Sequence, residues 1–466
     1  MRHDNPDKPI IASVSVMFLI GLFLRIFAVS TALKDERYNP YSRLMGDAAR
    51  YVALAVGINQ GVGYSDCYEP VLADVFKDPK HVKPAAVKLT ARKAIGYPLF
   101  LAAIFSLFGY SLTPVLFAQA VISALSALIV YLIALRVYSW RSAMVAYLLT
   151  LFYYPFWHRA ATIMVETLLI FFTLLFFYCL VRWRMRPSVS AAFLKALSAG
   201  ASILVKPVFL PVIQLYLLWA FAGARRQHRL KPFTIEVVTF ALGLAIFIAP
   251  WVVRNYQHSK RIILTPTFAG YQLIQVYNPY NLDFQVYESD PGFITEDYPG
   301  FQDYIEKDLK LDGWAATSPI LAEYLQDRAY ARASVKFIFD NPVYFFRAIF
   351  RTFWNTWRAD YPDKRVMNKA NGIVSGAGGI QFLFFKAENL VFYVGMIPFF
   401  IFGVYISIKN RNTQALSIIL FFAYFVIVHS VFASMIRYRI IVMPLFFILS
   451  AFGLIEFWNR VKSLRK

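Results

Sequence analysis

One acidic residue near the start of the sequence has the setting of a catalytic base. Asp47 belongs to the segment 46–51, GDAARY, in which apolar and polar residues alternate at helical spacing and predict a short amphipathic helix. A carboxylate is favoured at the start of a helix because the helix dipole is positive there. Two interpretations of Asp47 are open at this point: a helix cap, or a base that accepts a proton from a substrate.

Several basic residues stand where apolar segments begin or end, and such cations could bind a phosphate group. Two adjacent cations precede a Gly-Tyr-Pro turn, and two arginines separated by one residue precede the last apolar segment. The candidate phosphate-binding residues are Arg92, Lys93, Lys206, Arg254, Arg437 and Arg439. Each could instead anchor the chain to ordinary anionic headgroups or extend outward from a span.

An ionisable residue inside an apolar segment is a functional hypothesis by default. Glu166 would lie two helical turns from Arg159 if one helix contained both residues. Glu166 is therefore a second candidate catalytic residue, with a structural ion pair as the alternative. Arg25, in the first apolar segment, is expected to extend outward to the headgroups. Candidate substrate-binding residues near these positions are Tyr51, Tyr97, His158, Arg159 and Tyr438.

The elements that must position these residues are those of a membrane protein. Hydrophobic residues make up 59% of the 466 residues and charged residues 16%, whereas soluble domains carry about 25% charged residues. The net charge of +21 in so apolar a chain favours lipid and lipid phosphate as partners over nucleic acid. The sequence contains no phosphate-binding glycine loop with a lysine, no His-Glu-x-x-His and no Gly-x-Ser-x-Gly motif. Chemistry driven by a bound nucleotide is therefore not expected.

Ten apolar segments are candidates to cross about 30 Å of hydrocarbon. They are Ile10–Leu33, Phe117–Leu135, Ala143–Trp157, Ala160–Val181, Val189–Val205, Val208–Ala224, Phe233–Val253, Leu390–Ile408, Leu416–Ala433 and Ile440–Trp458. Lys and Arg gather in the short loops on one side, which the positive-inside rule assigns to the cytoplasm together with both chain ends. A further segment, Tyr97–Leu112, is short and is expected to be an interfacial or re-entrant helix on the outer side.

We therefore predict an all-α polytopic membrane protein in three parts, with amphipathic helices on its outer face. The parts are a transmembrane bundle at 1–253 with the first outer loop (34–116) that carries the catalytic Asp, a larger α or mixed outer domain at 254–388, and C-terminal spans with a basic cytoplasmic tail at 389–466. Within the outer domain a helix is expected at Ser318–Phe339 and a flexible loop at Asn371–Gly379.

Taken in order, these pieces resemble the GT-C glycosyltransferases that use polyprenyl-phosphate sugars. That group includes the dolichyl-phosphate-mannose protein mannosyltransferases and the bacterial lipid A aminoarabinose transferases. The motifs that carry the resemblance are Gly46-Asp47 with Tyr51, Gly61-Val62-Gly63-Tyr64, Arg92 through Phe100 with Gly109, Glu166 with Leu168-Leu169, Lys206-Pro207, Ala249-Pro250-Trp251 with Arg254-Asn255, and Arg437-Tyr438-Arg439 before Pro444. The chain departs from many relatives in having Ala48 where they have Glu, and Lys206 where they often have Arg.

The resemblance implies a GT-C fold, Asp47 as the catalytic residue on the periplasmic or extracytoplasmic face, and basic residues that bind the phosphate of an undecaprenyl-type or other polyprenyl donor. The chemistry agrees, because a lipid phosphate is a good leaving group and the site needs only a base and positive charge. We therefore predict a glycosyltransferase of EC class 2.4 in the plasma (inner) membrane that works by an inverting single displacement. The acceptor is a lipid, a glycan or a protein.

No cofactor is required by this scheme, and no metal site is predicted. A Mg²⁺ or Mn²⁺ ion held by Asp47, Glu166 and Asp66 is an open alternative, since divalent cations of this kind prefer oxygen ligands. Two other functions also stay open. A lipid-linked glycan ligase or polymerase would share the outer arginines, and a flippase would need charges at the membrane midplane and preferably an internal repeat.

Overall fold

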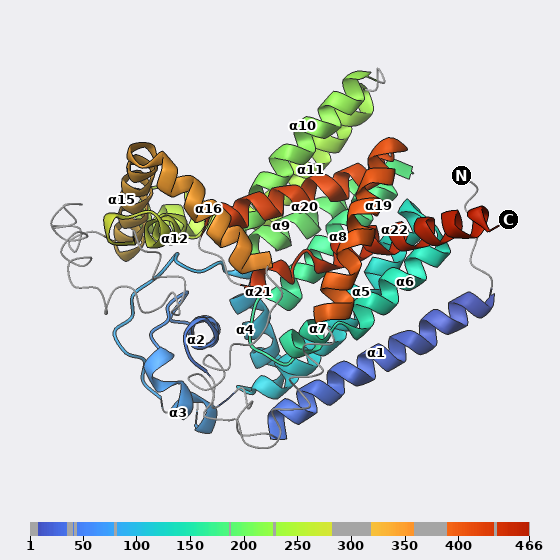
Figure 1. The fold of residues 1–466 in the computed structure, drawn as a ribbon. Helices are drawn as coiled ribbons and strands as arrows, with labels where there is room; N and C mark the ends of the chain where they lie inside the picture. The colour runs from blue at the N-terminus through green and yellow to red at the C-terminus, as the bar shows by residue number, and fades with distance from the viewer. Residues whose placement is uncertain are drawn as a thin grey trace.

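The structure, a computed structural model, is all-helical in the part of the chain that it describes. The described residues are 8–34, 41, 44–78, 82–185, 188–226, 230–281, 318–357, 389–432 and 436–465. Every regular element among them is a helix, so the predicted all-α class is confirmed for this part (Figure 1). The predicted loop Asn371–Gly379 lies outside the described residues.

Eight helices in the described residues are long and apolar enough to cross a membrane. They are α1 (Lys8–Lys34), α5 (Leu112–Val137), α8 (Glu166–Met185), α10 (Leu210–Arg226), α11 (Leu230–Ser259), α19 (Ile397–Lys409) with the helical turns before it from Leu390, α20 (Thr413–Val431) and α22 (Met443–Leu464). They form one bundle, and the N-terminus and C-terminus lie at the same end of it (Figure 1). All eight overlap segments that we predicted to span.

Three further apolar helices are shorter. They are α4 (Gly96–Phe108), α6 (Trp140–Phe152) and α9 (Val189–Val205). The 13 residues of α4 are too few to cross the hydrocarbon, as the sequence indicated. The other two correspond to predicted spans, so the total of ten spans stays a prediction.

The predicted span Ala143–Trp157 is broken. The chain leaves α6 and begins a second helix, α7 (Tyr154–Ala160), with Pro155 in its first turn, a position that suits a residue without an N–H. The carbonyl of Leu151 then has no partner in its own helix, and it accepts a hydrogen bond of 2.7 Å from the indole N–H of Trp157. The guanidinium of Arg25 donates a second, longer hydrogen bond of 3.5 Å to the same carbonyl.

The expectation that Arg25 extends outward is therefore wrong. Its side chain is fully buried, and it donates through Nε to the hydroxyl of Ser123 at 2.8 Å and through Nη1 to the carbonyl of Gly21 at 2.9 Å. A cation beside Leu151 is favoured because the carboxyl end of a helix carries partial negative charge. Arg25 thus fastens α1 to the break in α6.

The elements that the sequence predicts for the outer side, which we call the outer elements, gather at the opposite end of the bundle from the two chain ends (Figure 1). They are α2 (Asp47–Asn59), α3 (Leu72–Lys77), α12 (Ala269–Val276), α15 (Pro319–Asp340), α16 (Pro342–Trp357) and α21 (Ile436–Arg439). The predicted helix at Ser318–Phe339 is confirmed as α15, whose first turn is capped by the hydroxyl of Ser318. The described part of the outer domain is helical.

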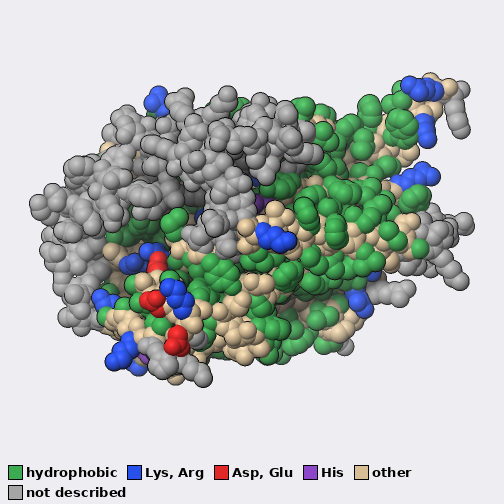
Figure 2. Space-filling model, turned by 90° about the horizontal axis from the view of Figure 1, so that it is seen from below, with side chains coloured by type: hydrophobic (Ala, Val, Ile, Leu, Met, Phe, Trp, Pro, Cys, Tyr) green, Lys and Arg blue, Asp and Glu red, His purple; other side chains and the backbone are tan. Residues whose placement is uncertain are grey.

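The surface of the molecule divides in the same way. In Figure 2 the described Asp and Glu side chains on this face gather with Lys and Arg at the end where α2 and α3 lie. The middle of the face is largely hydrophobic, and further Lys and Arg side chains appear at the other end. This distribution is typical of a protein with a lipid-facing belt between two aqueous sides.

Two glycines let the last helices pack closely. A Cβ atom at Gly453 of α22 would lie 1.9 Å from the carbonyl oxygen of Phe399, and one at Gly403 of α19 would lie 2.2 Å from that of Leu449. Small residues at such positions allow membrane helices to approach backbone to backbone.

We expect Gly453→Ala to destabilise the protein by about 1–3 kcal/mol, because the added methyl group must push the two helix backbones apart. Thermal unfolding in detergent would measure this as a lower Tm. Gly223→Ala is the matched control, because a Cβ atom at Gly223 has open space around it. Equal Tm values for the two variants would contradict the close packing of α19 against α22.

Candidate active site

Asp47 is shared by two cations from distant parts of the chain. It is the first residue of α2 and follows Gly46, whose φ of 56° lies in the left-handed region that glycine adopts readily. Its Oδ1 lies 2.6 Å from Nζ of Lys93, just before α4, and its Oδ2 lies 3.2 Å from Nη2 of Arg437 in α21. Three of the predicted site residues therefore meet at one point.

The two cations keep Asp47 ionised. Burial by itself raises the pKa of this carboxyl group, but the charges and hydrogen bonds of Lys93 and Arg437 outweigh that effect and lower the pKa from 3.8 to about 2. In this state the carboxylate is a weak base, since its proton affinity is low.

Glu166 also lies at this site. It is the first residue of α8, is 1% exposed, and its Oε1 lies 3.9 Å from Nε of Arg437. Arg437 therefore stands between the two candidate catalytic carboxylates. The expectation that Glu166 and Arg159 share one helix is wrong, because α7 ends at Ala160 and α8 begins only at Glu166.

Lys206 and Tyr438 complete the basic side of the site. The Nζ of Lys206, which follows α9, lies 3.7 Å from the centre of the Tyr438 ring. The guanidinium of Arg437 lies 5.4 Å from that ring, and the ring of His429 is edge-on to it at 5.3 Å. An aromatic face between two cations attracts both of them, which allows Lys206 and Arg437 to lie near each other.

Aromatic rings form the other side. Tyr51, one turn after Asp47 in α2, lies edge-on to Tyr97 with ring centres 5.2 Å apart. Tyr97 is buried and donates to Oε1 of Gln119 at 2.8 Å. The ammonium of Lys93 lies 5.9 Å from the centre of the Tyr51 ring. Tyr51 is thus next to the paired charges, whereas the hydroxyl of Tyr97 is directed into the bundle.

Arg92 does not join Asp47. Its Nε lies 3.7 Å from Oε1 of Glu323 in α15. The same carboxylate accepts hydrogen bonds from the hydroxyl of Thr90 at 2.8 Å, the N–H of Ala91 at 2.7 Å and the hydroxyl of Thr267 at 3.4 Å. Burial raises the pKa of Glu323, and these hydrogen bonds oppose that rise. Glu323 therefore fixes the position of residues 90–92, which lie immediately before Lys93.

Arg254 supports the same segment from α11. It donates to the carbonyls of Thr90 at 2.8 Å and Tyr64 at 3.3 Å. The hydroxyl of Tyr64 in turn donates to the carbonyl of Lys93 at 3.1 Å. The predicted phosphate ligand Arg254 thus positions backbone in this structure rather than facing Asp47.

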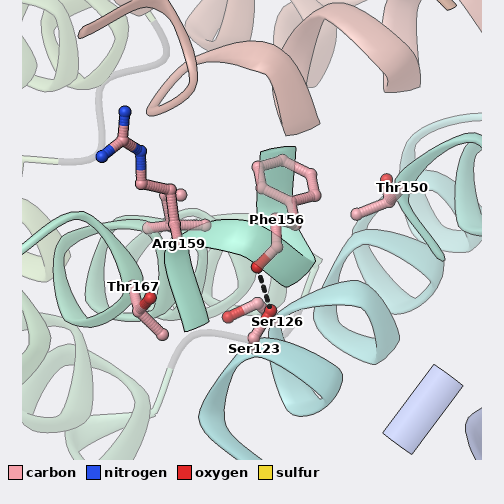
Figure 3. Close-up of a pocket in the computed structure, with 7 residues that line it drawn as sticks. Ser123, Ser126, Thr150, Phe156, Arg159 and Thr167 are labelled. Carbon is pink, nitrogen blue, oxygen red and sulfur yellow. Dashed lines mark hydrogen bonds between the residues drawn. The ribbon is translucent and has the colours of Figure 1, made fainter. Parts of the chain in front are cut away.

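Three other predicted residues have their contacts elsewhere. Arg439 lies over the ring of Tyr393 at 4.4 Å, and His158 stacks on Tyr154 at 6.0 Å. Arg159 lines a small cavity between α5, α6, α7 and α8, together with Ser123, Ser126, Thr150, Phe156, Thr167 and Ile170. Its guanidinium extends away from the hydroxyls of that cavity (Figure 3).

Sequence reasoning missed Glu323. It lies in an acid-rich outer segment without a recognisable motif, and its four partners come from two other parts of the chain. The only local signal is an acidic residue within an otherwise apolar turn of a helix. Among the described residues, no three His, Cys, Asp or Glu side chains gather into a group that could hold a metal ion. The set Asp47, Glu166 and Asp66 is therefore not assembled.

The match to a known family covers the part of the chain that carries much of this site. Residues 92–253 match the family model of the dolichyl-phosphate-mannose-protein mannosyltransferases. The resemblance predicted from the sequence is confirmed for this segment. The matched segment includes Lys93, Glu166 and Lys206. No curated protein matches the chain.

A solved structure shares the fold. The chain is similar to the oligosaccharyltransferase AglB of Archaeoglobus fulgidus, which was solved with an inhibitory peptide and a dolichol-phosphate. The two chains are 15% identical with a TM-score of 0.52, and the match covers 98% of this chain and 51% of AglB. This chain thus spans about half the length of that enzyme. A second similar structure is ArnT of Cupriavidus metallidurans bound to undecaprenyl phosphate, with 14% identity and a TM-score of 0.38 over 95% of this chain and 77% of that one.

We expect Asp47→Asn to lower the Tm, because Lys93 and Arg437 then face each other without a counter-charge. The pKa of Asp47 is depressed to about 2, so its ionised form stabilises the fold at every pH above about 4, and that stabilisation is lost only as the pH falls toward 2. The difference in Tm between wild type and variant should therefore be constant from pH 8 to pH 5. Asp74→Asn, at an exposed position of α3, should leave Tm unchanged. A difference that stays constant as the pH falls from 5 toward 2 would mean that folding leaves the pKa of Asp47 at its ordinary value.

We expect Glu323→Ala to loosen the segment 88–95. Four groups lose their acceptor, and hydrogen–deuterium exchange of Ala91 should rise. Asp327→Asn is the control on the same helix, because Asp327 accepts from the N–H of Tyr271 in α12 and interacts with this segment through the charge of Arg92 rather than through a backbone hydrogen bond. Similar exchange of 88–95 in both variants would show that Glu323 does not hold it.

Proposed function

We propose that the protein is an integral membrane glycosyltransferase that moves a sugar from a polyprenyl-phosphate donor to an acceptor. The observation that carries the proposal is the pairing of Asp47 with Lys93 and Arg437, next to Glu166. A carboxylate and several cations at one mouth of a membrane bundle are the groups that this reaction needs. The family match of residues 92–253 and the shared fold support it.

The reaction follows from the charges. A hydroxyl or amine of the acceptor attacks the anomeric carbon of the sugar as the bond to the phosphate oxygen breaks, and the configuration inverts. Asp47 takes the proton of the attacking group. The phosphate leaves with a negative charge that Lys93, Lys206 and Arg437 stabilise, with the arginine able to offer two parallel hydrogen bonds.

The donor itself makes Asp47 a better base. In the free site Lys93 and Arg437 lower the pKa of this carboxyl group to about 2. A bound phosphate competes for both cations, so each interacts less with Asp47 and the pKa of the carboxyl group rises. The base therefore becomes active when the leaving group is in place.

The remaining predicted residues take supporting roles in this proposal. Glu166 orients Arg437, and Tyr51 and Tyr438 line the space where a sugar would lie. Arg92 and Arg254 act through the segment that carries Lys93, because their hydrogen bonds and ion pairs are made there. Three of the six predicted cations, Lys93, Lys206 and Arg437, would then bind the phosphate of the donor.

We further propose that α9 and the broken pair α6–α7 join the eight long helices to give ten spans in the plasma (inner) membrane, with both chain ends in the cytoplasm. The basic loops at the end of the bundle opposite the site support this orientation. The site then faces the extracytoplasmic side, where its acceptor is a lipid, a glycan or a protein. No cofactor takes part in the proposed steps.

The direct test is release of free polyprenyl phosphate by purified protein supplied with a panel of polyprenyl-phosphate sugars and cell-envelope extract. Asp47→Asn should lower turnover by about 10²–10⁴, the contribution of a general base. Asp74→Asn is the control, because Asp74 is an exposed carboxylate on α3. Both variants should be used only after unfolding curves establish that they are folded.

The products separate this function from its rivals. Release of a pyrophosphate carrier would mean a ligase or polymerase. Movement of intact donor across vesicles without release would mean a flippase. Unchanged turnover in folded Asp47→Asn would remove Asp47 from the mechanism.

A further inference from the structure

Helix α16 descends beside a membrane-spanning helix. At its start, Tyr344 packs edge-on against Tyr277, whose hydroxyl donates to the carbonyl of Val431 at the outer end of α20. At its end, the ring of Trp357 lies 5.4 Å from that of Phe422, which is nine residues deeper in α20. Nine helical residues correspond to about 13 Å. Because Phe422 lies at the middle of the 19 residues of α20, the far end of α16 reaches the depth of the middle of that span.

The two faces of α16 have different environments. The buried face consists of Tyr344, Ala348, Thr352 and Thr356. The opposite face carries large apolar side chains that are exposed, namely Val343 at 64%, Phe346 at 69%, Phe350 at 68% and Trp354 at 59%. We call these four residues the apolar stripe. They recur every three or four positions, which places them along one side of the helix.

A row of cations stands at the entrance to this stripe. Arg328, Arg332 and Lys336 follow one another at four-residue intervals on α15 and line an open groove with Ala331 and Val335. All three are exposed, and none forms a salt bridge with a described carboxylate. Like charges at this spacing repel each other, so an anion in the groove would relieve a destabilising arrangement.

The row and the stripe are continuous. Phe339, which is 80% exposed, lies three residues after Lys336 on the same face of α15 and four residues before Val343. Exposed Arg347 lies within the stripe, and a side chain on a helix leans toward the N-terminal end, which here is the outer end. The order from outside inward is cations, then aromatic and aliphatic side chains. This is the order of phosphate and acyl chains in a lipid leaflet.

We propose that α15 and α16 form a binding surface for an anionic phospholipid of the leaflet on the side of the active site. Arg328, Arg332 and Lys336 bind its phosphate, and the apolar stripe packs against its acyl chains. Continuity with α20 favours a lipid as the occupant, because Leu420 and Ile427 of that span are also exposed and apolar. The surface is separate from the cations at Asp47, and the proposal holds whether or not the protein transfers sugars.

The depth of the stripe is tested by a fluorescent label. Phe350→Cys and, as a control, Asp74→Cys on exposed α3 are labelled with bimane in protein reconstituted into vesicles; the native cysteines, Cys67 and Cys179, are buried. Lipids that carry a spin label on the acyl chain should quench the label at 350 and not that at 74. Absence of quenching at 350 would mean that another part of the chain or a second copy covers the stripe, and it would overturn the proposal.

The phosphate contact is tested by neutralising the row. The variant is Arg328→Gln/Arg332→Gln/Lys336→Gln, and the control changes three cations at the other end of the molecule, Arg460→Gln/Lys462→Gln/Arg465→Gln. Native mass spectrometry of protein from mixed phosphatidylglycerol and phosphatidylcholine nanodiscs measures bound lipid. Each cation near a charged surface changes affinity by about fivefold, so the first variant should bind phosphatidylglycerol on the order of 100-fold more weakly.

Three outcomes of that experiment would overturn the proposal. The first is equal loss of phosphatidylglycerol in both triple variants, with Tm values that show both are folded. The second is equal retention of phosphatidylcholine and phosphatidylglycerol by the wild type. The third is displacement of phosphatidylglycerol by inorganic phosphate alone, which would indicate a site for free phosphate rather than lipid.

Discussion

A single carboxylate between two cations is the interaction on which the arrangement of the outer elements depends. Lys93 and Arg437 would repel each other if they came together without Asp47, and Asp47 would be costly to bury without them. Each charge makes the position of the other two favourable. The three residues belong to α2, to the segment before α4 and to α21, so this one cluster ties the first outer loop to the last spans.

Neighbouring residues hold Lys93 and Arg437 in place without contacting Asp47 themselves. Glu323 and Arg254 hold the backbone before Lys93 through hydrogen bonds from two different helices, α15 and α11. Glu166 and the ring of Tyr438 flank Arg437. Preorganisation of this kind lets charged groups stabilise a developing charge without rearrangement. The cations of the site are therefore held by several contacts, which suits the negatively charged leaving group of the proposed reaction.

The same physical rule operates inside the bundle. Lys195 of α9 is buried and contacts Glu236 of α11 and the hydroxyl of Tyr216 of α10, so the three polar groups satisfy one another. Arg25 donates through Nε and Nη1 to a hydroxyl and to two carbonyls, one of which belongs to Leu151 at the end of α6. Charged groups in lipid must find partners within the protein. Each such group thereby joins helices that are distant in the sequence.

Local pattern determined much of what the sequence could predict. Apolar runs located the spans, helical periodicity located α2 with Asp47 near its start, and the length of its apolar run indicated that α4 is short. A helix was also expected where α15 lies. These features depend on residues within one or two turns of each other, so a single segment contains the information. The candidate cations could be named for the same reason, since each stands at the end of an apolar run.

Only the tertiary structure decided which charges meet. Lys93 contacts Asp47 whereas adjacent Arg92 contacts Glu323, and Arg437 reaches Asp47 from 390 residues away. The break between α6 and α7 frees the carbonyl of Leu151, and only the packing of α1 against it brings Arg25 to that carbonyl. Spacing along the chain specifies the face of a helix but not the neighbour of that face. Charge pairing acts over a few ångströms in space, so it depends on the packing of the whole bundle.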